Sequence, residues 1–170
     1  MTEMDVAMLI LRLAVGAVFL AHGIKHARGR VKTSNWFGSL GFRAPQMQWF
    51  LSTATEIGIG LLLIIGLFTS LVAAGLIGVM AVAFWTVHRH AGFWITARPD
   101  EGWEYVFVLS AVALAMAIAG PGSVSVDGAI GLDTVLDGWV GALLSAGGVA
   151  AAAGQLALFY RPSEVDSTAG

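Results

Sequence analysis

Four ionisable residues lie in or beside long apolar segments of the chain, where their chemistry would be unusual. They are Arg12, His22, Glu56 and Glu104. Glu56 is the only charged residue in the segment STATEIGIGLLLIIGLF, residues 52–68. Ionisable groups are costly in hydrocarbon and commonly mark sites for ions, protons or ligands. Imidazole and carboxylate groups can relay protons or hydrogen-bond a quinone head group, so we predict that these four residues line a ligand or proton site.

The spacing of neighbouring residues predicts that Arg12 and Glu56 face each other. One helical stripe of the first segment holds Arg12, Gly16, Phe19, Gly23 and His26, and one face of the second holds Trp49, Ser52, Thr53, Glu56, Gly60 and Leu63. At about 1.5 Å per residue, Arg12 lies roughly 10 Å and Glu56 roughly 18 Å from the outer ends of their segments. We therefore predict an Arg12–Glu56 ion pair. Such a pair has two open interpretations, a functional site or a purely structural contact. Glu56 could instead be protonated.

A second group of ionisable residues gathers where the predicted helices end on the other side. Its members are His22, Lys25, His26, His88, Arg89, His90 and Glu104. The spacing of His22 and His26 also matches two metal ligands, but paired histidines at a membrane interface are more commonly polar belt residues, so we predict no metal site. Glu104 has an alternative interpretation as a first-turn carboxylate that the helix dipole favours.

The composition is that of a membrane protein. Of 170 residues, 57% are hydrophobic and 12% are charged, and the mean hydropathy is +0.80. There is no cysteine, so redox chemistry would need a bound cofactor, such as a quinone, or a partner protein. The motifs of nucleotide-binding proteins and of serine or zinc hydrolases are absent, and nothing indicates nucleic-acid binding.

Five apolar runs predict an all-α transmembrane bundle. They cover residues 6–23, 48–68, 71–87, 103–119 and 139–160. The last run carries small residues at helical steps that would let another helix approach closely: Gly141, Ser145, Gly148 and Ala152. If all five runs span, Lys25, Arg28, Arg30, Lys32, Arg43, Arg89, Arg98 and Arg161 share one side. Because basic loops stay in the cytoplasm, we expect the N-terminus outside and the C-terminus in the cytoplasm.

The order and spacing of several motifs resemble the DoxX family of small bacterial membrane proteins over about the first 127 residues. The motifs are LRLAVGAVFLAHGIKH, NWFGSLGFRAP, TEIGIGLLLIIGLFTSLVA and GWEYVFVLSAVALAMAIAGPGSVSVD. Besides Arg12, Glu56 and Glu104, the residues that carry the resemblance include Gly16, Gly23, Lys25, Gly60, Tyr105 and Asp127. The chain departs from the family pattern at Ser123 and Val124, where basic and aromatic residues are common, and this weakens an anion-binding role for that loop.

The resemblance implies a four-helix core at residues 1–127 in a bacterial cytoplasmic membrane. Residues 128–160 would add an outer loop and a fifth transmembrane helix, and residues 161–170 would form a polar cytoplasmic tail. Family members are linked to thiosulfate:quinone oxidoreduction and to oxidative-stress assemblies in membranes. We therefore expect a redox-associated subunit, with other membrane redox proteins as partners, whose polar pocket takes a quinone-like or other small ligand.

Two other functions remain open at this stage. The first is a non-catalytic accessory or assembly subunit of a respiratory or stress-response complex, which would use the small-residue face of the fifth helix as its contact. The second is a small proton-coupled transporter, which would need a water-filled path from Glu104 to Glu56. The sequence is compatible with catalytic turnover and with its absence.

Overall fold

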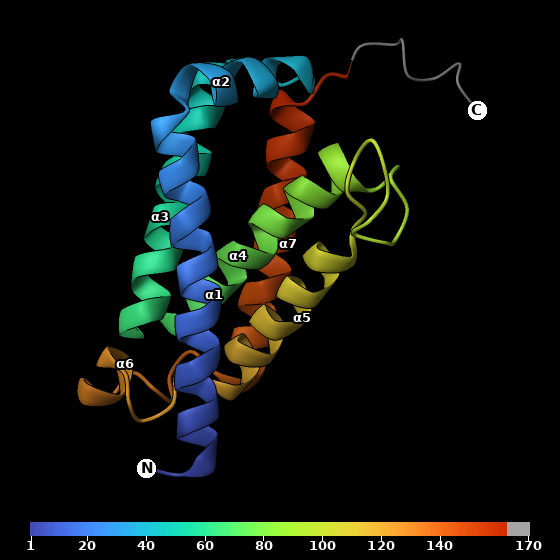
Figure 1. The fold of residues 1–170 in the computed structure, drawn as a ribbon. Coiled ribbons are helices and arrows are strands. Elements are labelled where there is room, and N and C mark those ends of the chain that lie inside the picture. Colours follow the sequence, from blue (N-terminus) through green and yellow to red (C-terminus); the bar gives the residue numbers. More distant parts are fainter. Residues whose placement is uncertain (163–170) are drawn as a thin grey trace.

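The computed structural model describes residues 1–162, which form helices and connecting loops without a β-strand (Figure 1). The long helices are α1 (Glu3–Arg28), α3 (Pro45–Ile65), α4 (Thr69–Ala83), α5 (Glu104–Ala119) and α7 (Gly138–Phe159). A π-helical turn, η1 (Phe84–His88), extends α4. These helices coincide with the five predicted apolar runs, so the all-α membrane bundle is confirmed. Of the predicted polar tail, residues 163–170 lie outside the described residues.

Two shorter helices were not predicted. α2 (Arg30–Ser39) lies across one end of the bundle, at the opposite end from the N-terminus (Figure 1). α6 (Val126–Ala129) forms a single turn in residues 120–137, the connection between α5 and α7, which we name the outer loop after the side on which it is predicted to lie. By length and composition α1, α3, α4 with η1, and α7 can each cross a membrane. α5 has 16 residues, which corresponds to about 24 Å and is shorter than a typical hydrocarbon core of about 30 Å.

Glycines allow α1 and α3 to pack closely, and the two predicted polar faces meet as expected. A Cβ atom built on Gly16 would lie 2.9 Å from the carbonyl oxygen of Gly60, and one built on Gly60 would lie 2.7 Å from the backbone nitrogen of Leu20. Both distances are below van der Waals contact, so only glycine fits at these positions without movement. Arg12 and Glu56 are both buried along this contact.

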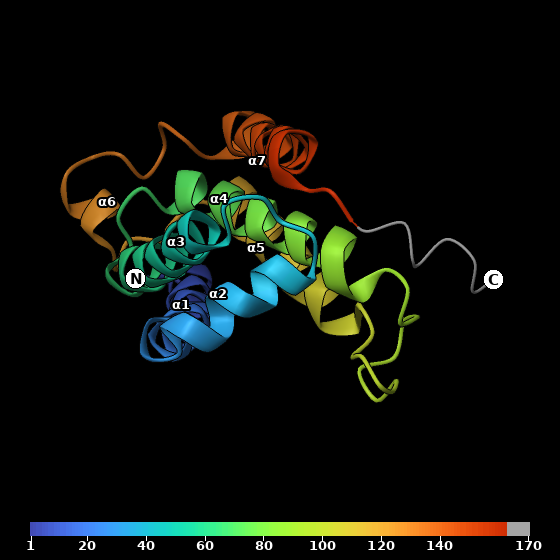
Figure 2. The same cartoon turned by 90° about the horizontal axis from the view of Figure 1, so that it is seen from above.

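α7 belongs to the bundle and packs on α4 and α5, on the outer side of α4 as seen from above (Figure 2). Its small residues make the contact, since Gly148 lies against the backbone of Ala74 and Gly141 against the carbonyl of Ala117. The predicted close helix approach is therefore confirmed as a contact within the chain. The expectation that this face binds another subunit is wrong, because α4 and α5 already cover it.

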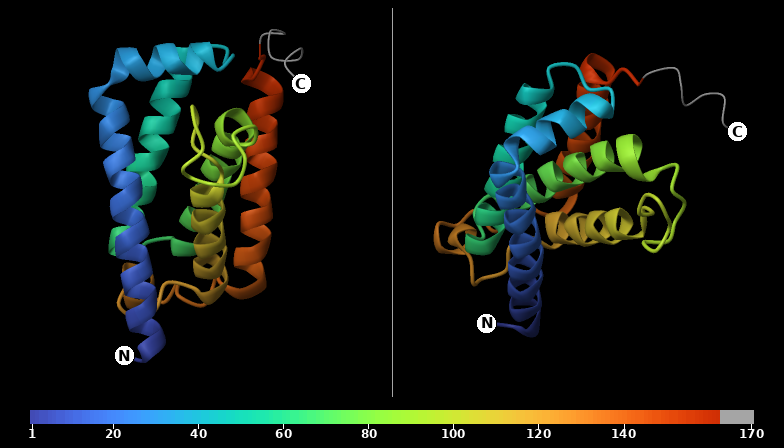
Figure 3. Two further views of the ribbon diagram at one scale, coloured as in Figure 1. Left: turned by 45° about the vertical axis from the view of Figure 1, so that its right-hand side comes forward. Right: turned by 45° about the horizontal axis from the view of Figure 1, so that its top comes forward.

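The end of α7 is tied to the segment that precedes α3. Arg43 N donates a hydrogen bond to Phe159 O, and Arg161 N donates one to Gly41 O, both at 2.8 Å. In addition, the Gln155 Nε2 donates to Oε1 of the buried Gln48 at 2.8 Å. These bonds join the α1–α2–α3 part of the chain to α7 at the α2 end of the molecule, where Figure 3 shows the end of α7 near that of α2.

Candidate functional site

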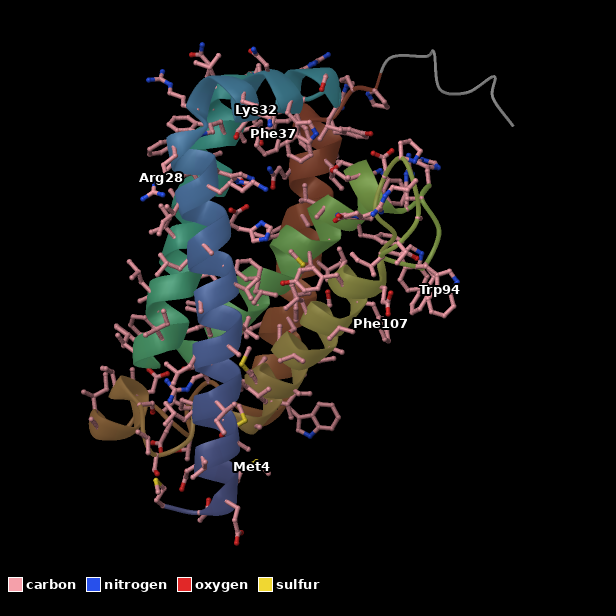
Figure 4. All side chains as sticks on the ribbon, viewed as in Figure 1. Met4, Arg28, Lys32, Phe37, Trp94 and Phe107 are labelled. Carbon is pink, nitrogen blue, oxygen red and sulfur yellow. The ribbon has the colours of Figure 1, made fainter. Side chains whose placement is uncertain are left out.

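A cleft of about 1400 Å³ lies at the α2 end of the bundle, between the helices. One wall is polar, with His22, Lys25 and His26 from α1 and Ser52 and Thr55 from α3. The facing wall comes from α4, η1 and α7. It is made mainly of small and apolar residues, namely Gly75, Gly78, Val79, Gly148, Ala151 and Ala152, together with the polar Thr86, His88 and Gln155. Phe37 on α2 also lines the cleft, and Figure 4 shows it at this end of the bundle. The cleft is therefore mostly apolar, and its lysine and arginine side chains come from α1 and α2.

His26 lies at the centre of the polar wall, and the carboxylate of Glu56 lies next to its ring. Nδ1 of His26 lies 3.1 Å from Oε2 of Glu56. This is an ion-pair distance, but the angles between the two groups are not those of a hydrogen bond. The other carboxylate oxygen of Glu56 accepts a hydrogen bond from Ser52 Oγ at 2.9 Å. The Glu56 side chain is 8% exposed, whereas that of His26 is 19% exposed and lines the cleft. Glu56 thus stands behind His26, with Ser52 bound to one of its carboxylate oxygens and the imidazole next to the other.

His22 completes the polar wall one helical turn before His26. Its ring centroid lies 6.4 Å from that of His26, with the two rings nearly perpendicular. Both rings line the cleft, so a ligand on this wall would meet two imidazoles. Within residues 1–162, no three His, Asp or Glu side chains come close enough together to hold a metal ion.

The predicted Arg12–Glu56 ion pair is wrong, because α1 and α3 are offset along their axes. Gly16 lies level with Gly60, and Gly23 lies level with Glu56. Eleven residues of α1 separate Arg12 from Gly23, a rise of about 16 Å that an arginine side chain does not span. The prediction placed the outer ends of both helices at the same depth, but α1 extends beyond α3 at the N-terminal end of the bundle (Figure 1).

Arg12 instead fixes the corner between α3 and α4. Its guanidinium group donates hydrogen bonds to Leu63 O at 3.3 Å and to Val124 O in the outer loop. Asp127 supplies an attractive negative charge for Arg12. The Asp127 carboxylate also accepts hydrogen bonds from Phe68 N at 2.7 Å and Thr69 N at 2.9 Å, and so caps the start of α4. Arg12 is 1% exposed and does not line the cleft.

Glu104 also lies outside the cleft. Its Oε2 accepts a hydrogen bond from Ile95 N at 3.1 Å and thereby holds the loop between η1 and α5. Tyr105, the next residue, does line the cleft, as does His88, whose Nδ1 lies 2.7 Å from Glu101 O. Of the four predicted site residues, the structure brings His22 and Glu56 together near the cleft and places Arg12 and Glu104 in separate structural contacts.

Sequence reasoning placed His26 near the other ionisable residues but did not assign it to the site. The signal was present, since His26 follows Gly23 by three residues on the same stripe of α1 as Arg12. The part of the cleft that α2 forms, with Thr33, Trp36 and Phe37, had no comparable signal, because this segment has neither an apolar run nor a clear helical period.

Comparison with known proteins gives a match to one family model and to several similar proteins. The DoxX family model matches residues 7–89. "Putative oxidoreductase CatD" of Bacillus subtilis is 30% identical over 112 residues, which cover 66% of this chain and 79% of the relative. "Inner membrane protein YphA" of Escherichia coli is 27% identical over 128 residues, covering 72% of this chain and 89% of the relative. An uncharacterized protein of Haemophilus influenzae is 26% identical over 130 residues, covering 72% and 82%. No solved structure gives a significant match.

Proposed function

Because the chain belongs to the DoxX family of membrane proteins, we propose that it is a redox-associated membrane subunit whose cleft binds a quinone-like small molecule. The observation that carries the proposal is that His26 lies on the wall of a large, mostly apolar cleft and is paired with Glu56 beside that wall. Sites for small molecules are mostly apolar, with a few polar groups that orient the ligand. A quinone matches this pattern, since its ring and tail are apolar and its two carbonyl oxygens accept hydrogen bonds.

The pair suits proton-coupled chemistry on such a ligand. Reduction of a quinone to a quinol adds two electrons and two protons. His26, paired with Glu56, would donate one proton to a carbonyl oxygen, and the second proton would come from water in the open cleft, which would also reprotonate His26. The chain has no cysteine to act as a redox centre, so the electrons would come from a bound cofactor or a partner protein, as in the thiosulfate or oxidative-stress systems to which the family is linked. The name of the Bacillus subtilis relative, "Putative oxidoreductase CatD", agrees with this proposal.

The cleft would lie in the cytoplasmic half of a bacterial inner membrane. Lys25, Arg28 and Lys32 lie at the α2 end, and basic residues favour the cytoplasmic side. Figure 4 shows Arg28 and Lys32 at this end and Met4 at the opposite end. The name of the Escherichia coli relative refers to the inner membrane. An accessory subunit without a ligand remains the alternative, but it would need a contact surface other than the small-residue face of α7, which α4 and α5 cover.

The test is binding of a soluble quinone to the purified protein in lipid nanodiscs. Decylubiquinone quenches tryptophan fluorescence, and Trp36 lines the cleft, so quenching should report saturable binding. We expect His26→Gln and Glu56→Gln each to weaken binding at least tenfold, the effect of one hydrogen bond to a charged group. The matched control is Glu3→Gln at the exposed start of α1, which should bind as the unmodified protein does.

Two results would contradict the proposal. One is the absence of saturable quenching in the unmodified protein. The other is unchanged affinity in Glu56→Gln and His26→Gln when both variants insert into membranes and unfold at the normal temperature.

A further inference from the structure

The mouth of the cleft is positively charged. Lys25 and Arg28 from the end of α1 and Lys32 from the start of α2 line it. In the part of the chain that the structure describes, no Asp or Glu lines the cleft, and His26–Glu56 is the only pair within ion-pair distance. The three basic side chains therefore have no carboxylate partner among residues 1–162. This arrangement favours a ligand that carries negative charge.

The position of these residues corresponds to the depth of lipid head groups. α2 lies across this end of the bundle instead of along the other helices (Figure 1). Trp36 on α2 is 42% exposed, and Trp49 at the start of α3 donates its indole N–H to His26 O at 2.8 Å. Tryptophan is enriched at the membrane interface, so the mouth opens at the level of the phosphate groups.

The cleft is also larger than a head-group ligand alone requires. Sites for drug-sized molecules have volumes of about 300–1000 Å³, whereas this cleft has about 1400 Å³. Its far wall consists mainly of small and apolar residues, such as Gly75, Gly78 and Gly148, and it offers hydrocarbon contacts over most of its surface. Such a wall suits an acyl chain.

We propose that the mouth of the cleft binds an anionic phospholipid. Its phosphate contacts Lys25, Arg28 and Lys32, and an acyl chain lies along the apolar wall of α4 and α7. Basic pockets between transmembrane helices on the cytoplasmic side recognise anionic head groups in this way. The proposal goes beyond quinone binding and depends on different side chains, so each proposal can fail while the other holds.

The experiment measures binding of phosphatidylglycerol to the full chain in a neutral detergent by native mass spectrometry, with phosphatidylcholine as the neutral lipid. The test variant is Lys25→Gln/Lys32→Gln. The matched control is Arg43→Gln/Arg98→Gln, which removes the same charge from two exposed residues that do not line the cleft. At about one factor of five per basic residue, the test variant should bind phosphatidylglycerol roughly 30-fold more weakly, and the control should bind it normally. Lys25→Arg/Lys32→Arg should keep the affinity, because it keeps both charges.

Other results would overturn the proposal. If both double variants lose affinity equally, the lipid responds to total charge and not to this site. If phosphatidylcholine binds as well as phosphatidylglycerol, the phosphate-binding role of the basic residues is wrong. If inorganic phosphate at millimolar concentration displaces phosphatidylglycerol and alone raises the unfolding temperature as much, the occupant is a free anion and not a lipid. Glu56→Gln should bind phosphatidylglycerol normally, which separates this result from the quinone test.

Discussion

Asp127 connects three parts of the chain at the end of the bundle that holds the outer loop, which we refer to as the outer end. It is 3% exposed, it accepts hydrogen bonds from Phe68 N and Thr69 N, and it supplies an attractive charge for the buried Arg12. Asp127→Asn would keep the size of the side chain but would remove one acceptor and the negative charge. Because a buried charge without its partner is costly, we expect the free energy of unfolding to fall by about 3 kcal/mol. Unfolding in mixed micelles with increasing dodecyl sulfate measures this change.

The control for this experiment is Asp133→Asn in the same outer loop. No side-chain hydrogen bond or ion pair of Asp133 occurs in the described structure, so this variant should unfold like the unmodified protein. Equal stability of the two variants would show that Asp127 does not hold the corner.

The contrast between Arg12 and Glu56 shows how far single residues can be predicted. Helical spacing correctly placed both side chains on the α1–α3 contact, because a helix fixes which residues share a face. It could not give the offset of α1 relative to α3 along their axes, which depends on where Gly16 and Gly60 interlock. The partner of each charge therefore differed from the prediction, and Glu56 contacts His26.

At the scale of helices, the small residues of α7 determine whether the fifth helix packs in the bundle. Gly147 and Gly148 are adjacent, but a Cβ atom at Gly148 would overlap the backbone of Ala74, whereas one at Gly147 would have no atom within 4 Å. Alanine is a better helix former than glycine by up to about 1 kcal/mol. We expect Gly147→Ala to leave stability unchanged or raise it slightly, and Gly148→Ala to lower it by about 1–3 kcal/mol. Thermal unfolding of the two purified variants makes the comparison.

The two variants make the same Gly→Ala change at adjacent positions that lie on different sides of α7. The change in helix propensity and in composition is therefore the same in both. If Gly148→Ala were as stable as Gly147→Ala, the close contact between α7 and α4 would not exist in the membrane.

The long helices were predictable, but the elements that shape the cleft were not. Apolar runs as long as those of α1 and α3 predict membrane helices, because a helix satisfies the hydrogen bonds of its own backbone in lipid. α2 is different, because its sequence RVKTSNWFGS is polar and its helical conformation depends on packing of Thr33, Ser34 and Phe37 against the rest of the chain. The tie between Gln48 and Gln155 likewise joins residues 107 positions apart and has no local signal.

The whole molecule is held together differently at its two ends. At the outer end, Arg12 and Asp127 draw α1, the α3–α4 corner and the outer loop together. At the other end the helices enclose the cleft, and α2 and the end of α7 are joined across it mainly by loop contacts. The fixed outer end can keep the helices in register while the cleft end adapts to a ligand.

This arrangement has a functional meaning only if the cleft faces the cytoplasm, and the chain is well suited to a direct test. It has no cysteine, so a single introduced cysteine gives an unambiguous label. Thr134 lies in the exposed outer loop, Ser39 at the end of α2 and Pro162 after α7.

In spheroplasts we expect a membrane-impermeant maleimide to label Thr134→Cys directly and to label Ser39→Cys and Pro162→Cys only after permeabilisation. If all five long helices cross the membrane, the two ends of the chain lie on opposite sides. Labelling of Pro162→Cys without permeabilisation, with Ser39→Cys protected, would then mean that α7 does not cross. Labelling of Ser39→Cys alone would reverse the orientation and place the basic mouth of the cleft outside, against the distribution of its lysines and arginines.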